Sequence, residues 1–98
     1  MDRLKLNKDL SILNLLLYLG NRFGVDKFII NDYWDADLCS IGLSDPQKKV
    51  IIYISTYNKK KGQYYISIEN NDDSSILIEE SDNIGVTELE ARFGKHIN

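Results

Sequence analysis

Apolar residues recur at helical spacing near the start of the chain, between Leu10 and Phe23. Four residues with polar side chains interrupt them every three or four positions and define a narrow solvent-exposed stripe: Ser11, Asn14, Tyr18 and Arg22. Asn7 or Asp9 can cap the start of such a helix, and Gly24 suits the position just past its end. The pattern predicts a long N-terminal helix whose apolar face packs against a sheet.

Short segments rich in Ile, Val and Tyr follow, and this composition is typical of β-strands. They are residues 28–33, 38–43, 50–57 and 63–70, with a fifth candidate at 76–80. Two of the connections carry turn residues, Pro46 in one and Gly62 in the other. Because a parallel crossover needs about a dozen residues or more, these short connections predict an antiparallel meander.

The C-terminal segment Thr87-Glu88-Leu89-Glu90 matches a helix capping box. We expect a short helix over residues 87–93, with Gly94 ending it. Together the elements predict one α+β domain over residues 1–98. It is an antiparallel β-meander of four to five strands packed on a long N-terminal helix, with a short C-terminal helix.

Alternation along the predicted strands separates two faces of the sheet. One face is apolar and is expected to lie under the long helix: Cys39, Ile41, Leu43, Val50, Ile52, Ile54, Tyr64, Ile66 and Ile68. The other face mixes tyrosine and serine: Ser40, Gly42, Ile51, Tyr53, Ser55, Tyr57, Tyr65, Ser67 and Glu69. That mixture is favoured in protein-binding surfaces, although tyrosine and serine also suit the solvated side of an antiparallel sheet.

The composition is ordinary for one globular domain, with 98 residues, 43% hydrophobic residues and a formal net charge of −3. A single cysteine excludes an internal disulfide. Asp9, Asn14 and Asn21 interrupt the first apolar run, so we expect neither a signal peptide nor a membrane span. The expected compartment is therefore the cytoplasm.

The acidic residues are unevenly distributed. Twelve of the fifteen lie in two segments without lysine or arginine, one between Lys27 and Lys48 and the other between Lys61 and Arg92. Such tracts repel a phosphate backbone, which argues against a nucleic-acid partner. The one basic cluster, residues 59–61, is interpreted as a solvated turn that protects a sheet edge.

Candidate catalytic and metal-binding groups are few. The only histidine, His96, lies two residues from the end of the sequence, and Cys39 is expected in the core. Asp32, Asp35 and Asp37 offer oxygen ligands of the kind calcium takes, but the glycine and the closing glutamate of an EF-hand loop are absent. We therefore expect a protein that is not an enzyme and holds no metal or cofactor.

Three segments carry a family resemblance: Asp-Ala-Asp-Leu-Cys-Ser-Ile-Gly at 35–42, Tyr-Ile-Ser-Thr-Tyr at 53–57 and Tyr-Tyr-Ile-Ser-Ile-Glu at 64–69. They resemble the small immunity proteins of bacterial polymorphic-toxin and contact-dependent growth inhibition systems. The resemblance covers roughly residues 28–70. It implies a cytoplasmic inhibitor, encoded with a toxin, that binds the toxin's C-terminal domain, which is often a nuclease.

Charge gives the same expectation independently, because acidic tracts interleaved with aromatic residues match a basic, nuclease-like domain. The expected contact residues are acids and aromatics: Asp32, Tyr33, Trp34, Asp35, Asp37, Tyr65, Glu69, Asp72, Asp73, Glu79 and Glu80. The alternative is a structural or adaptor domain that forms a homodimer through the tyrosine and serine face or through an exposed sheet edge. Neither hypothesis involves direct contact with nucleic acid or a membrane.

Overall fold

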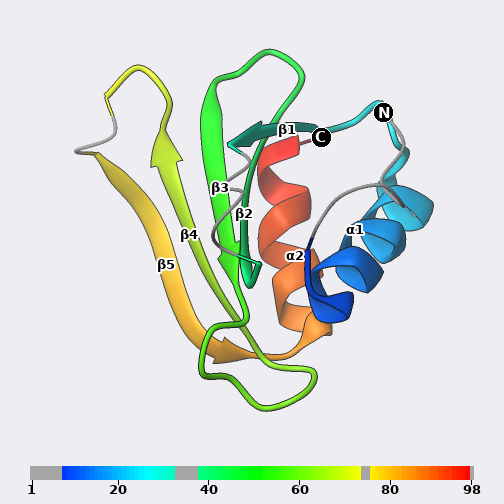
Figure 1. Cartoon of the computed structure of the whole chain (residues 1–98). Coiled ribbons are helices and arrows are strands. Elements are labelled where there is room, and N and C mark those ends of the chain that lie inside the picture. The colour runs from blue at the N-terminus through cyan, green and yellow to red at the C-terminus, as the bar shows by residue number, and fades with distance from the viewer. Residues whose placement is uncertain (1–7, 33–37, 74–75, 98) are drawn as a thin grey trace.

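Five antiparallel strands form one sheet, and both helices lie on the same side of it (Figure 1). The computed structural model describes residues 8–32, 38–73 and 76–97. Strand order follows the chain, β1-β2-β3-β4-β5, as a meander requires. The elements are α1 (Leu10–Phe23), β1 (Ile29–Asp32), β2 (Ser40–Ser44), β3 (Val50–Ser55), β4 (Tyr64–Asn70), β5 (Leu77–Ile84) and α2 (Val86–Ile97).

The predicted α+β class and the antiparallel meander are confirmed. Helix α1 begins and ends where the apolar spacing places it, but at 14 residues it is of ordinary length and not long. Its Ile12, Leu15, Leu16 and Leu19 are buried. Since α1 has only about four turns, it shares the cover of the sheet with α2.

The register of the strands brings the isoleucines together under the helices. Ile54 of β3 pairs with Ile41 of β2 and with Ile66 of β4, and all three are fully buried. Phe93 of α2 completes this core, packing edge-on against Phe28 with ring centroids 5.3 Å apart. Each such side chain contributes about 1.5–3 kcal/mol of burial free energy, so the helix-covered side is the stable body of the fold.

Helix α2 differs from the prediction at both ends. It begins at Val86, and the backbone oxygen of Gly85 accepts a hydrogen bond from the Leu89 nitrogen, so the capping box at Thr87 does not mark the start. The prediction that Gly94 ends the helix is wrong, because α2 continues to Ile97. Burial of Ile97 adds a favourable contribution that outweighs the cost of about 1 kcal/mol for glycine inside a helix.

Strand β5 is longer than predicted and runs to Ile84. Its pairing with β4 shifts twice, between Tyr64 and Ile66 and between Ile68 and Glu69. Each shift turns the following side chains to the opposite face, so simple alternation cannot assign them. Among the described residues, no helix is long and apolar enough to cross a membrane.

Candidate functional site

The side of the sheet opposite the helices carries the tyrosine and serine set, and we call it the open face. Cross-strand pairs define it, because partners in register point to the same side. The pairs are Ser40 with Ser55, Tyr53 with Ser67, Ser55 with Tyr65, Ser67 with Glu80 and Glu69 with Leu77. Both helices lie on the other side, so neither helix covers the open face.

Tyrosine and serine side chains on the open face hold one another in place. The Tyr53 hydroxyl lies 2.9 Å from the Ser40 hydroxyl, which lies 3.0 Å from that of Ser55. The rings of Tyr53 and Tyr65 meet edge to face with centroids 5.9 Å apart. Because these contacts already restrict the rotamers, a partner binding here loses little side-chain entropy on this surface.

Carboxylates border this aromatic centre on strands β4 and β5. The Tyr65 hydroxyl donates a hydrogen bond to the Glu80 carboxylate. The pKa of Tyr65 is raised, mainly by burial of the hydroxyl and secondly by this hydrogen bond. Glu69 lies on the same face. Among the residues that the structure describes, no lysine or arginine forms an ion pair with Glu69 or Glu80. Their negative charge is therefore available to a partner.

A hollow of about 780 Å³ opens beside these tyrosines. Tyr53, Tyr57 and Tyr65 line it, together with Lys59 and Asp82. The Lys59 ammonium pairs with Asp82 and lowers the pKa of that carboxyl. The lysine side chain is only 14% exposed, and its charge is balanced by the Asp82 carboxylate.

The described residues of the predicted site fall into three places. Tyr65, Glu69 and Glu80 lie together on the open face. Asp72 and Asp73 are exposed in the turn after β4, where the Asn70 side-chain oxygen accepts from their backbone nitrogens at 2.8 and 3.2 Å. That turn lies beyond the end of β4.

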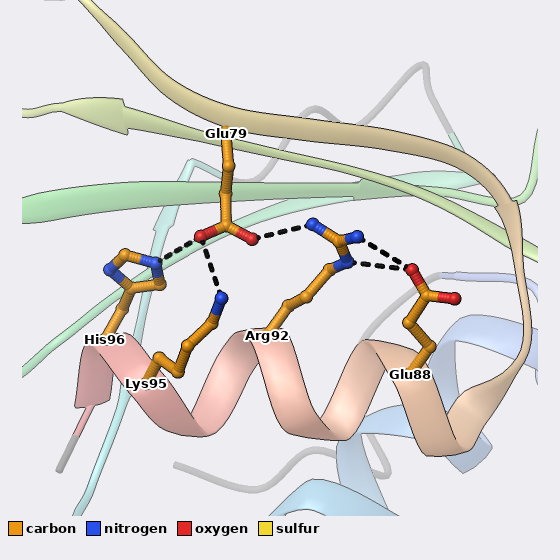
Figure 2. Close-up of polar contacts among 5 residues, drawn as sticks. All are labelled: Glu79, Glu88, Arg92, Lys95 and His96. Atoms are coloured by element: carbon orange, nitrogen blue, oxygen red, sulfur yellow. Dashed lines mark hydrogen bonds and ion pairs between the residues drawn. The ribbon is translucent and has the colours of Figure 1, made fainter.

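Glu79 is separated from the other predicted residues because it points to the helix side. Figure 2 shows its carboxylate among the side chains of Arg92, Lys95 and His96 of α2. Its oxygens lie 2.9 Å from Arg92, 3.0 Å from His96 and 3.4 Å from Lys95. These contacts, with that of His96 the largest, lower the pKa of Glu79. Glu79 therefore links β5 to α2 within the protein.

The remaining predicted residues cannot be placed on the open face from the structure. Tyr33, Trp34, Asp35 and Asp37 lie outside the described residues. The backbone of Asp32 ends β1 and pairs with Gly42, but its side chain is outside the described part. Whether this acidic and aromatic segment contacts a partner stays a prediction.

Two sequence interpretations are wrong at the rim of the hollow. Cys39 is partly exposed and not buried in the core, and its thiol lies 3.2 Å from the Asp9 carboxylate. Lys59 is not a solvated turn residue, because it is paired with Asp82. Asp82 was missed as a site residue because the second bulge of β5 lies beyond residues 76–80, where the predicted strand ended.

In residues 8–32, 38–73 and 76–97, no three His, Cys, Asp or Glu side chains come together in a way that could hold a metal ion. Comparison of the chain with family models, with curated proteins and with solved structures finds no match. We therefore infer function from the geometry and charge of the open face.

Proposed function

We propose that this chain is an immunity protein that binds a cognate bacterial toxin domain and neutralises it by binding alone, without catalysis. The observation that carries this proposal is the open face, the side of the sheet that neither helix covers, with ordered tyrosines at its centre and carboxylates on β4 and β5. The sequence resemblance to small immunity proteins supports the same function. The site of action is the cytoplasm, where such a toxin domain would act.

Aromatic anchors supply the affinity in this proposal. Protein interfaces of ordinary size bury about 800 Å² on each partner, and a few aromatic or charged residues dominate their binding energy. Tyr53 and Tyr65 present rigid amphipathic rings whose hydroxyls are already bonded within the sheet. They can pack against a partner without leaving a polar group unsatisfied.

Carboxylates supply the choice of partner. Glu69 and Glu80 place unneutralised negative charge beside the tyrosines. A nuclease domain carries basic residues that bind nucleic-acid phosphates, so its active-site surface complements this charge. Occupation of that surface would exclude the nucleic acid and inhibit the toxin.

The test is protection of growing cells. The toxin to be tested is the C-terminal domain of any large secreted protein that is found encoded directly upstream of this chain. Co-expression with the wild-type chain is expected to restore growth, whereas a Tyr65→Ala, Glu80→Lys double variant is expected to fail. An Asp26→Lys variant, changed in the exposed turn after α1, is the matched control and should protect fully. Growth arrest in the presence of the wild-type chain contradicts the proposal.

A second candidate function is self-association, and the free edge of β5 favours it. Three consecutive apolar residues at that edge, Ile76, Leu77 and Ile78, are each about half exposed. An exposed apolar edge strand is a template for pairing with another chain. Mass measurement in dilute solution separates the two functions, because a tight dimer that a Leu77→Lys variant converts to monomer favours self-association.

A further inference from the structure

Tyrosine rings and bonded serine hydroxyls line the hollow on the open face. The bonded hydroxyls of Ser40 and Ser55 lie in it, and the Tyr53 and Tyr65 rings form its aromatic side. Tyr57 also lines it and is 73% exposed. The hollow is therefore lined by aromatic side chains and by serine hydroxyls that bond one another.

Among the described residues that line this hollow or bond to its lining, negative charge exceeds positive charge. Asp9, Lys59 and Asp82 line it, and Glu80 adjoins it through its bond to Tyr65. Lys59 neutralises one of the three carboxylates. Of the described residues, only the Cys39 thiol and no cation contacts the Asp9 carboxylate. An incoming cation is therefore attracted.

The carboxylates keep free oxygen atoms for such a cation. Both contacts to Asp82, from Lys59 and from the Asn83 backbone nitrogen, use Oδ1. The thiol of Cys39 uses Oδ2 of Asp9. Within the described part of the chain, Oδ2 of Asp82 and Oδ1 of Asp9 remain as acceptors.

Arginine suits these groups better than lysine. A guanidinium is planar, stacks on tyrosine and carries five N–H donors, so one of them can bond to a carboxylate oxygen that is still free. A lysine ammonium is a compact and strongly hydrated charge that gains less from an aromatic wall. A volume of about 780 Å³ exceeds that of a single side chain, so backbone flanking the arginine also has room.

We propose that this hollow receives an arginine side chain of the partner protein, between the tyrosines and the Asp82 carboxylate. The partner is the basic toxin domain, so the physiological role rests on the proposed function. The chemical preference belongs to this chain alone and can be measured without the toxin.

The experiment is a titration of the ¹⁵N-labelled chain with N-acetyl-arginine methylamide, followed by amide chemical shifts. Shifts at Ser55, Tyr57 and Tyr65 are expected to saturate at millimolar probe. The citrulline analogue has nearly the same shape but no charge. We expect its affinity to be lower than that of the arginine probe by a factor of at least about five. Equal binding of the two probes, or shifts confined to the helices, would overturn the proposal.

Two variants locate the interaction. Asp82→Asn removes a carboxylate and leaves the Lys59 charge unneutralised, so arginine binding is expected to fall severalfold, whereas Asp26→Asn should not change it. The second variant is Tyr57→Ala, which is also expected to weaken arginine binding. The Tyr57 side chain is 73% exposed, so it can be removed without disturbing the core. Unchanged arginine binding in both hollow variants would overturn the proposal.

Binding of the arginine probe and protection of cells can fail independently of each other. Selective binding of the arginine probe without protection of cells supports the hollow and contradicts the immunity function. Protection of cells without any binding of the probe supports immunity and overturns the arginine site.

Discussion

The carboxylate of Glu79 on β5 lies 2.9 Å from the guanidinium of Arg92 on α2, and this ion pair ties the edge strand to the C-terminal helix. Glu80, the next residue, points to the open face and accepts from Tyr65. Neighbouring residues of a strand point to opposite faces. Two adjacent glutamates therefore have different roles, one internal and one available to a partner.

A Glu79→Gln variant is expected to lower the free energy of unfolding by about 1–2 kcal/mol, because it removes a charged acceptor shared by Arg92, Lys95 and His96. The Glu79 side chain is 19% exposed, which limits screening by water. Glu80→Gln is the matched control, and its exposed position predicts a change below about 0.5 kcal/mol. Urea unfolding measures both. Equal losses in the two variants would contradict the assigned roles.

Acid is expected to remove the contribution of Glu79. Its contacts, with that of His96 the largest, lower its pKa below the ordinary value of 4.5, so the folded protein holds this proton less tightly than the unfolded chain. The stabilisation is therefore complete above that value and is lost as the pH falls through the lower pKa of the folded state. The difference in stability between wild type and Glu79→Gln should shrink between about pH 5 and pH 3. A difference that is constant across this range would contradict the mechanism.

The elements that the sequence predicts best are those with uniform spacing. In helix α1 the apolar residues keep the helical spacing throughout, and in the strands around Ile54 they alternate regularly. The structure has both as expected. Strand β5 departs from the predicted strand because its bulges change the period. Helix α2 continues past Gly94 because burial of Ile97, a tertiary contact, outweighs the local preference.

Only part of the candidate site follows from local sequence. The tyrosine and serine face was predictable, because it depends on the alternation of regular strands. The pairing of Lys59 with Asp82 was not, because it joins a hairpin turn to a strand 23 residues later in the chain. Proximity of that kind is set by the packing of whole elements.

Two glycines with open space around them are expected to respond oppositely to serine. No atom lies within 4 Å of a Cβ built at Gly62 or Gly85, but Gly62 has a φ of +82°. Gly62→Ser should destabilise by about 1 kcal/mol, because L-residues rarely adopt that conformation. Gly85→Ser should stabilise by up to about 1 kcal/mol, since it restricts the unfolded chain and can cap α2. Thermal unfolding of both variants tests this, and the same sign of change in both would contradict it.

If the proposed partner is a basic toxin domain, charge reversal at Glu69 and Glu80 is expected to slow its association with this chain. Both lie on the open face, and neither pairs with a lysine or arginine of the described chain, so their attraction acts at long range in dilute salt. The Glu69→Lys, Glu80→Lys variant should associate at least about tenfold more slowly near 0.05 M salt, and its rate should depend less on salt than that of the wild type. Reversal of Glu88 on α2 is the control and should leave the rate close to that of the wild type. Stopped-flow mixing at several salt concentrations measures these rates. Equal slowing by the open-face and α2 reversals would show that net charge, and not the open face, steers the encounter.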